Sequence, residues 1–149
     1  MTIRPVAADD AATWSAMRAR LWPTADAREL RAECDAFLRG EAVASIAVVL
    51  LAEEEAEASG FIELAIRPFA DGCDSQPVAH VEGWYVEPHV RGRGVGRALM
   101  HAGESWARER GFTEIASDTE VHNEASLAAH VRCGFEETER LIKLRKPLP

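Results

Sequence analysis

The segment Arg91-Gly-Arg-Gly-Val-Gly-Arg97 constrains the chain most, because it stands between a predicted strand and a predicted helix. At such a junction the first N–H groups of the helix lack partners, and the positive end of the helix dipole faces the loop. Glycines let the main chain approach a ligand closely, and the arginines add positive charge. The sequence therefore predicts an anion-binding loop. Its predicted contact residues are Arg91, Gly92, Arg93, Gly94, Val95, Gly96 and Arg97.

Two well-known phosphate-binding loops are excluded by the residues around this one. A P-loop ends in Gly-Lys-Ser/Thr, whereas Gly96 is followed by Arg97 and Ala98. A dinucleotide-binding fold places its glycine-rich turn after the first strand, whereas this turn follows several strands. A basic turn that binds no ligand remains open as the plainer alternative.

The length and charge of the chain limit the classes of protein to which it can belong. Its 149 residues suffice for one buried core, so we expect a single domain over 1–149. The net charge of −8 makes nucleic acid and anionic membranes poor partners and favours a cationic one. No stretch is apolar over a full membrane span, and the three cysteines fit neither a disulfide framework nor a zinc site. We expect a cytoplasmic protein without a metal.

Hydrophobic spacing predicts an α/β chain with a mixed, mostly antiparallel central sheet flanked by helices. Strands are expected at 2–6, 43–52, 60–67, 78–86, 113–118 and 135–144. Helices are expected between Asp9 and Pro23 and over 25–39, 94–110 and 123–132. The element order is β-α-α-β-β-β-α-β-α-β.

The loop and the strand before it, which ends Gly-Trp-Tyr-Val-Glu-Pro, resemble motif A of the GNAT superfamily of N-acetyltransferases. Downstream, a helix that opens at Asn123 and ends before Gly134-Phe135 is similar to motif B of that family. The resemblance implies the GNAT fold, acetyl-CoA as acyl donor, and direct attack by an amine in a ternary complex. It adds cofactor contacts from Tyr85, Val86, Asn123 and Ser126 to those of the loop.

A narrower resemblance spans most of the chain. Segments outside the cofactor motifs, among them 14–23, 60–64, 72–78, 116–119 and 134–140, are similar to aminoglycoside 6′-N-acetyltransferases. The resemblance implies acetylation of the 6′-amine of an aminoglycoside antibiotic, resistance to that antibiotic, and a homodimer. The implied substrate-binding residues are Trp22, Phe69, Glu82, Asp118 and Glu137.

The residue types suit such a substrate. An aminoglycoside carries several ammonium groups, so its site needs carboxylates and an aromatic face. Glu82 lies late in a central strand, where it could orient the amine and accept its proton, and Asp118 ends the neighbouring strand. His130 stands where many GNAT enzymes carry a tyrosine that protonates the leaving thiolate. The predicted catalytic residues are Glu82, Asp118 and His130.

Plainer interpretations of these residues remain open. Exposed carboxylates at strand ends are often inert, Trp22 could belong to the core, and His130 could lack a catalytic role. The chain could also acetylate a polyamine or another small amine. A non-catalytic acyl-CoA-binding module and an anion-binding protein unrelated to acyl transfer are the alternatives outside the enzyme class.

Overall fold

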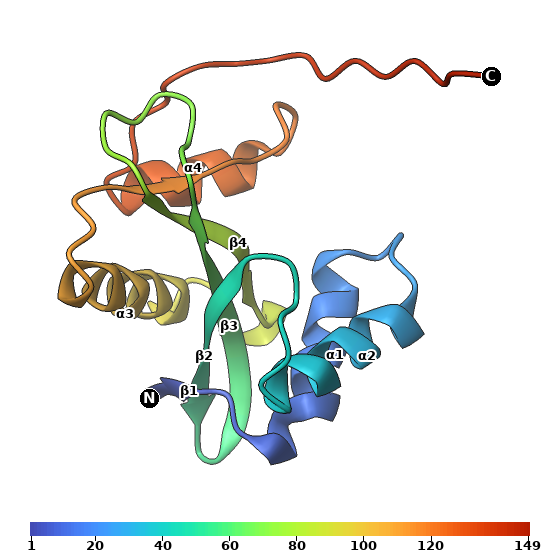
Figure 1. The fold of residues 1–149 in the computed structure, drawn as a ribbon. Coiled ribbons are helices and arrows are strands. Elements are labelled where there is room, and N and C mark those ends of the chain that lie inside the picture. Colours follow the sequence, from blue (N-terminus) through green and yellow to red (C-terminus); the bar gives the residue numbers. More distant parts are fainter.

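A five-stranded sheet, in the order β1-β2-β3-β4-β5, forms the centre of the computed structural model, which describes all residues from 1 to 149 (Figure 1). Its strands are β1 (Thr2–Pro5), β2 (Ile46–Glu54), β3 (Glu57–Arg67), β4 (Val78–Val86) and β5 (Ile115–Ser117). The first four pair antiparallel and β5 pairs parallel with β4. The predicted mixed, mostly antiparallel sheet flanked by helices is confirmed.

Four α-helices cover the two faces of the sheet. They are α1 (Ala11–Leu21), α2 (Ala27–Leu38), α3 (Val95–Glu109) and α4 (Glu124–Arg132). Short 3₁₀ turns lie at Ala8–Asp10 and Pro88–Val90. In Figure 1, α1 and α2 lie on one side of the sheet, and α3 lies on the other.

The core is divided between these two faces. Toward α3 the sheet buries alternate residues such as Ile62 and Leu64 against Leu99. Toward α1 and α2 it buries Phe61 against Trp14. The strict alternation of side chains along β3 produces both faces, because successive residues of a strand point in opposite directions.

Several predicted boundaries shift by one to three residues, for local reasons. The second helix begins at Ala27 because the Asp26 carboxylate accepts hydrogen bonds from the first N–H groups of α2. The third begins at Val95, since Gly94 is its N-cap residue with φ of 90°. No helix of the structure is both long and apolar enough to cross a bilayer.

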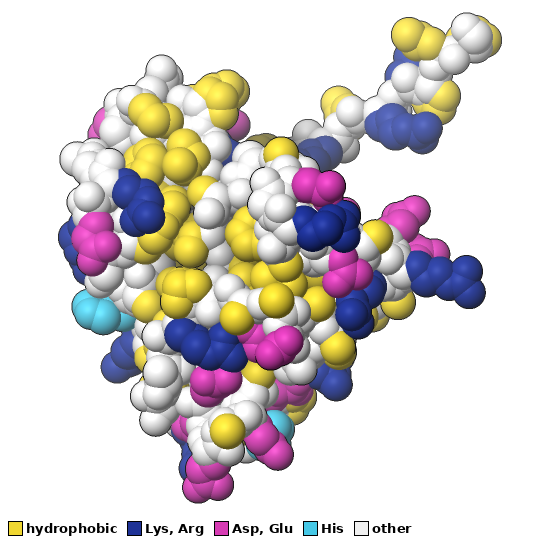
Figure 2. Space-filling view, turned by 60° about the horizontal axis from the view of Figure 1, so that its bottom comes forward, with side chains coloured by type: hydrophobic (Ala, Val, Ile, Leu, Met, Phe, Trp, Pro, Cys, Tyr) yellow, Lys and Arg dark blue, Asp and Glu magenta, His cyan; other side chains and the backbone are white.

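The predicted last strand, 135–144, is wrong for this structure. Residues 135–149 form no helix or strand, and the chain beyond Arg140 runs away from the body as an extended tail (Figures 1 and 2). A strand exists only where a neighbour accepts its backbone hydrogen bonds, and β5 offers just three residues. The tail leaves Ile142 and Leu144 85% and 91% exposed.

Candidate functional site

The loop before α3 carries a set of unpartnered backbone N–H groups. In the structure the N–H groups of Gly92, Gly94, Val95, Gly96 and Arg97 find no acceptor. Gly92 and Gly94 adopt positive φ angles of 79° and 90°, which turn successive N–H groups toward the same side. Together with the dipole of α3, they give the loop the arrangement of donors that an anion site needs.

The arginines of the loop divide their roles. Arg91 donates through Nε to the Val86 carbonyl at 2.8 Å and so fastens the loop to the end of β4. Arg93 lies 3.9 Å from the Glu54 carboxylate. Arg97, in the first turn of α3, makes no ion pair and is exposed. Of the three loop arginines, Arg97 is therefore the one whose positive charge is least neutralised by other groups of the protein.

Beside the loop, β4 and β5 separate. They pair over three residues, and the last pair is Val81 with Ser117. Residues 82–86 of β4 therefore have no strand on that side. The open edge lies between the loop and the carboxylates described below.

The backbone of β4 presents donors along this edge. The Glu87 N–H donates to the Ser59 carbonyl on β3 at 2.9 Å. Because alternate residues of an antiparallel strand bond the same neighbour, the Val86 N–H points to the opposite, open side. This N–H can polarise a carbonyl oxygen bound along the edge.

Glu82 occupies a β-bulge. Gly83 pairs with Glu63 on β3 and Val81 pairs with Leu64, so Glu82 is an extra residue without a partner. Bulges redirect a side chain and often lie beside active sites. This one turns Glu82 toward His80 and Arg67 on the α1–α2 side of the sheet.

Glu82 and Asp118 lie on either side of a buried histidine. The Glu82 carboxylate accepts two hydrogen bonds from Arg67, at 2.8 and 2.9 Å, and is 24% exposed. His80 lies between the two acids, with Nδ1 3.3 Å from Glu82 and Nε2 3.7 Å from Asp118. The structure thus brings together two of the predicted catalytic residues, and adds a histidine and an arginine that the sequence argument missed.

Burial keeps His80 neutral. It lowers the pKa of the imidazole below its usual 6.5, and the positive charge of Arg67 lowers it further. The negative charges of Glu82 and Asp118 act in the opposite direction but do not reverse the shift. A neutral ring near pH 7 does not repel an incoming ammonium group.

Trp22 forms an aromatic wall next to the bulge. Its ring lies over Gly83, where a Cβ atom would come within 3.0 Å of it, so only glycine allows this approach. The Arg18 guanidinium lies 5.1 Å from the centre of the Trp22 ring and 5.6 Å from that of Trp14. Trp22 is half-buried and can present its edge to a ligand near Glu82.

A network of buried charged side chains lies behind the Trp22 ring. Glu63 is 1% exposed and lies 2.8 Å from Arg18 Nε, and it accepts a hydrogen bond from Trp14 Nε1 at 2.9 Å. Arg18 also donates to Glu33 at 2.8 Å. Burial raises the pKa of the Glu63 carboxyl to about 7, although Arg18 lowers it in part. The network fixes the guanidinium that packs on Trp22.

Phe69 and Glu137 are not brought into contact with this cluster. Phe69 is 60% exposed in the loop after β3. Glu137 lies in the tail and pairs with Arg140, which lowers the pKa of its carboxyl. Their predicted substrate contacts stay predictions.

His130 is held in a defined tautomer. Nδ1 lies 2.7 Å from the Ser126 carbonyl, which can only accept, so Nδ1 carries the hydrogen. Nε2 then accepts from the Ser117 hydroxyl at 2.8 Å when the ring is neutral. The ring packs edge-on against Trp84 and Phe135. His130 therefore lies at the point where β4 and β5 separate, next to the last residue of β5.

The remaining predicted cofactor residues also make contacts within the fold, and their predicted cofactor contacts stay predictions. The Asn123 side chain accepts from the Ser126 N–H and caps α4. Tyr85 is buried on the α1–α2 face, and its hydroxyl donates to Glu87 at 3.2 Å. Of this group only Val86 offers a backbone donor to the open edge.

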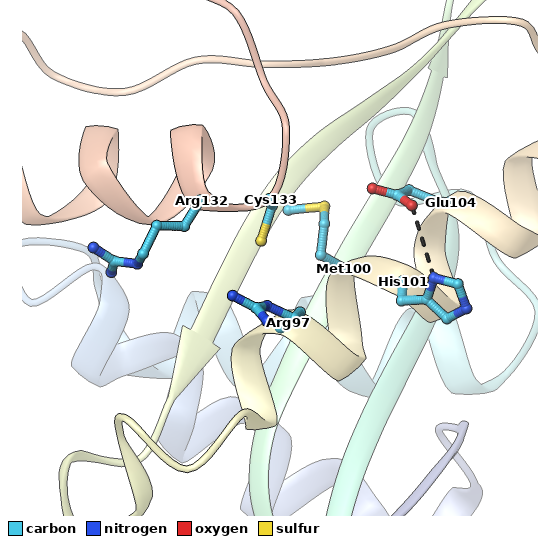
Figure 3. A pocket seen from close by; sticks show the side chains of 6 residues that line it. All are labelled: Arg97, Met100, His101, Glu104, Arg132 and Cys133. Atoms are coloured by element: carbon cyan, nitrogen blue, oxygen red, sulfur yellow. Dashed lines mark ion pairs between the residues drawn. The ribbon is translucent and has the colours of Figure 1, made fainter.

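Two clefts border the loop. The first, which we call the α3–α4 cleft, has a volume of about 360 Å³ (Figure 3). It is lined by Arg97, Met100, His101 and Glu104 of α3 and by Arg132 and Cys133 at the end of α4. The second, the hairpin cleft, has about 600 Å³ and includes Glu54, Glu55, Glu57, His89 and Arg93. No group of three or more histidine, cysteine or acidic side chains is arranged to hold a metal ion.

Known proteins match this arrangement in sequence and in structure. The profile of the acetyltransferase (GNAT) family matches residues 10–135. An aminoglycoside N(6′)-acetyltransferase type 1 from Klebsiella aerogenes is 47% identical over 98% of this chain and 96% of its own length. A second, from Stenotrophomonas maltophilia, is 43% identical over 99% of this chain and 94% of its own.

Solved structures of aminoglycoside acetyltransferases are similar to this chain over nearly its full length. AAC(6′)-Iy in complex with the bisubstrate analogue CoA-S-monomethyl-acetylneamine superposes with a TM-score of 0.88, at 35% identity over 99% of this chain and 98% of that one. The apo 6′-N-acetyltransferase AAC(6′)-IG from Acinetobacter haemolyticus gives 0.89, at 31% identity over the full length of both chains. With the family profile and near-complete relatives in agreement, the chain belongs to the GNAT family of acetyltransferases.

Proposed function

We propose that the protein transfers the acetyl group of acetyl-CoA to the 6′-amine of an aminoglycoside and so confers resistance to that antibiotic. One observation carries the proposal. The open edge of β4 has a set of free N–H groups at one end and the bulged Glu82 at the other. An acyl donor held along the edge would meet an amine at Glu82. The names of the relatives supply the substrate class.

The loop fits the coenzyme. Its unpartnered N–H groups and the dipole of α3 suit the diphosphate, and the Val86 N–H suits the thioester oxygen. Acetyl-CoA supplies the activated acetyl group. The protein supplies alignment, because positioning two reactants can lower a barrier by about 7–11 kcal/mol.

The carboxylates fit the amine. Arg67 already rests against Glu82 through two hydrogen bonds, which supports a cation-binding role for this carboxylate. Glu82 would hold the 6′-ammonium, accept its proton directly or through water, and leave a neutral amine to attack. Asp118 is 77% exposed and would bind a second ammonium, while Trp22 would contact a sugar ring. Phe69 and Glu137 would bind more distant parts of the antibiotic.

His130 remains our proposed proton donor for the departing sulfur. In its neutral tautomer Nε2 accepts from Ser117, so the ring can donate on that side only when doubly protonated. The pH-rate profile of His130→Phe tests the role. A loss of turnover relative to wild type that is largest at low pH and shrinks as the pH rises supports it, and an unchanged profile removes His130 from the mechanism.

We further propose a cytoplasmic homodimer built from one domain per chain, with neither nucleic acid nor membrane as partner. The net charge of −8 and the three free cysteines support the location and partners. The tail supports the dimer, because it carries exposed apolar side chains that a second copy could cover. These are Leu141, Ile142, Leu144 and Leu148.

Turnover with acetyl-CoA tests the proposed activity. Kanamycin, tobramycin and gentamicin are compared with spermidine as acceptors at equal concentration, and the acetylated position is identified by mass spectrometry and NMR. We expect 6′-acetylation of at least one aminoglycoside. Turnover with spermidine alone would establish a polyamine acetyltransferase, and binding of acetyl-CoA without any turnover would indicate a non-catalytic module.

A further inference from the structure

Arg67 places a cation of the protein itself where the proposed function needs a cation of the substrate. It is the last residue of β3, and its guanidinium donates to both oxygens of the Glu82 carboxylate, at 2.8 and 2.9 Å. Glu82, and more weakly Asp118, act to raise the pKa of Arg67, so both carboxylates interact with its charge. The two acids that would hold the ammonium groups of an acceptor therefore already share one guanidinium.

No second cation of the protein neutralises Glu82. Its only other ion-pair partner is His80, whose Nδ1 lies 3.3 Å from the carboxylate. Burial, and then the charge of Arg67, lower the pKa of that imidazole, so the ring is neutral near pH 7. The charge of Glu82 in the protein without substrate therefore depends on Arg67 for its counterion.

The pair between Arg67 and Glu82 can open. The Arg67 side chain is 38% exposed and that of Glu82 is 24% exposed, so water reaches both partners. Ion pairs in contact with water are weak, because solvent screens the charges and holding a long side chain still costs entropy. Both oxygens of Glu82 already accept from Arg67, so an ammonium group gains full access to the carboxylate only when the guanidinium leaves.

We propose that Arg67 determines acceptor specificity by occupying the position of the 6′-ammonium, so that an acceptor must displace it from Glu82 to bind. This inference rests on the proposed function. An acceptor with a single ammonium group only exchanges one cation for another at Glu82. A polycation can also place an ammonium group at Asp118, which is 77% exposed and has no arginine or lysine in contact. Displacement of Arg67 therefore favours acceptors with several amino groups.

Neomycin and paromomycin, which differ only in an amine or a hydroxyl at the 6′ position, isolate this contact. In Arg67→Gln we expect the KM for neomycin at saturating acetyl-CoA to fall roughly tenfold, with kcat little changed. The inhibition constant of paromomycin in the same reaction should change by less than about threefold, because a hydroxyl brings no charge to Glu82. Arg67→Lys keeps the charge but loses the two-point grip, so its KM for neomycin should lie between those of wild type and Arg67→Gln.

Arg31→Gln is the matched control, because Arg31 also pairs with a carboxylate, that of Asp35 at 3.1 Å, on the exposed side of α2. It removes the same charge and the same kind of ion pair, and it should keep both wild-type constants. An unchanged or higher KM for neomycin in Arg67→Gln would overturn the proposal, since Arg67 would then not compete with the acceptor. Equal decreases for neomycin and paromomycin would also overturn it, because the gain would not depend on the 6′-amine. Absence of turnover with any aminoglycoside in wild-type protein would instead contradict the proposed function.

Discussion

At the scale of single residues, the site depends on how two carboxylates share one buried imidazole. His80 is neutral near pH 7 because burial and Arg67 lower its pKa. The negative charge of Glu82 is therefore neutralised mainly by Arg67, which donates two hydrogen bonds to the carboxylate, at 2.8 and 2.9 Å. A substrate ammonium group can replace or join that guanidinium. Proton transfer of this kind contributes about 10²–10⁴-fold to a rate, less than positioning can supply.

Replacing Glu82 by Gln should lower kcat without abolishing turnover. The amide keeps the shape of the side chain but loses the charge and the base, so we expect kcat to fall about 100-fold. Steady-state kinetics with tobramycin and acetyl-CoA measures the effect. Glu120→Gln is the control, because Glu120 is exposed beyond β5 and its side chain has no partner. A loss below threefold in Glu82→Gln would remove Glu82 as the base.

Glu63 gives the protein a pH-dependent stability. The pKa of its carboxyl rises from an ordinary 4.5 to about 7 on folding, so the folded state holds a proton that the unfolded state releases. The stabilisation is complete below pH 4.5 and is lost as the pH rises through about 7. Relative to Glu63→Gln, wild-type protein should lose about 3 kcal/mol of unfolding free energy over this range. Urea unfolding from pH 4.5 to 8 tests this, and parallel curves for the two proteins would contradict it.

Sequence reasoning missed Arg67 and His80, for different reasons. Arg67 and Glu82 lie on neighbouring strands, and their contact depends on a bulge that displaces the register by one residue. Nothing in the composition of either strand marks that bulge. The spacing of His80 and Glu82, two residues apart in a strand, was the available signal, because such residues share a face.

At the scale of elements, the junction of β4 and α3 determines what the loop can bind. Its strand, its glycines and its helix were all visible in the sequence, because each depends on local chemistry. The separation of β4 from β5 after Val81 was not, since it depends on where a distant strand ends. The glycine-rich junction could be predicted from the sequence, whereas the open edge beside it is visible only in the structure.

Gly94→Ala should weaken acetyl-CoA binding more than it weakens the fold. Gly94 has a φ of 90°, and an added Cβ meets nothing within 4 Å, so the cost is conformational, about 1–2 kcal/mol. The loop can relieve it only by turning its N–H groups. Gly111→Ala is the matched control, with a φ of 84° and equally open surroundings after the end of α3. Calorimetry should show similar losses of stability but weaker binding in Gly94→Ala alone, and equal binding in the two variants would contradict the account.

The predicted strand at 135–144 failed for a reason that belongs to this scale. Its residues carry strand-forming side chains, yet the single chain offers them no free neighbour. Phe135 packs against the His130 ring and the core, and Thr138 lies next to Gly72. In the proposed dimer, the second copy would supply a neighbour for the rest of the tail.

At the scale of the whole molecule, the sheet separates the proposed acceptor site from the proposed coenzyme site. Glu82, His80 and Trp22 lie on the face covered by α1 and α2, while the loop and α3 form the other side. The open edge of β4 connects them. The net charge of −8 favours a polycationic acceptor over an anionic one, which agrees with the carboxylates at the site.

Truncation after Arg140 should convert a dimer into a monomer. It removes the exposed Leu141, Ile142 and Leu144 but keeps the contact of Thr138 with Gly72. Sedimentation velocity of both proteins at micromolar concentration measures the state. Truncation after Lys146, which removes only Leu148 among the exposed apolar residues, is the control and should remain dimeric. A monomeric full-length chain would contradict the proposed dimer.

The proposed function depends on the loop from Arg91 to Arg97 holding the diphosphate of an acyl-CoA. Isothermal titration of the wild-type protein with acetyl-CoA, without acceptor, tests it most directly. We expect saturable heat with one site per chain, and much weaker binding for Gly94→Ala than for Gly111→Ala. A wild-type titration without any heat above dilution, repeated at a second temperature, would contradict it.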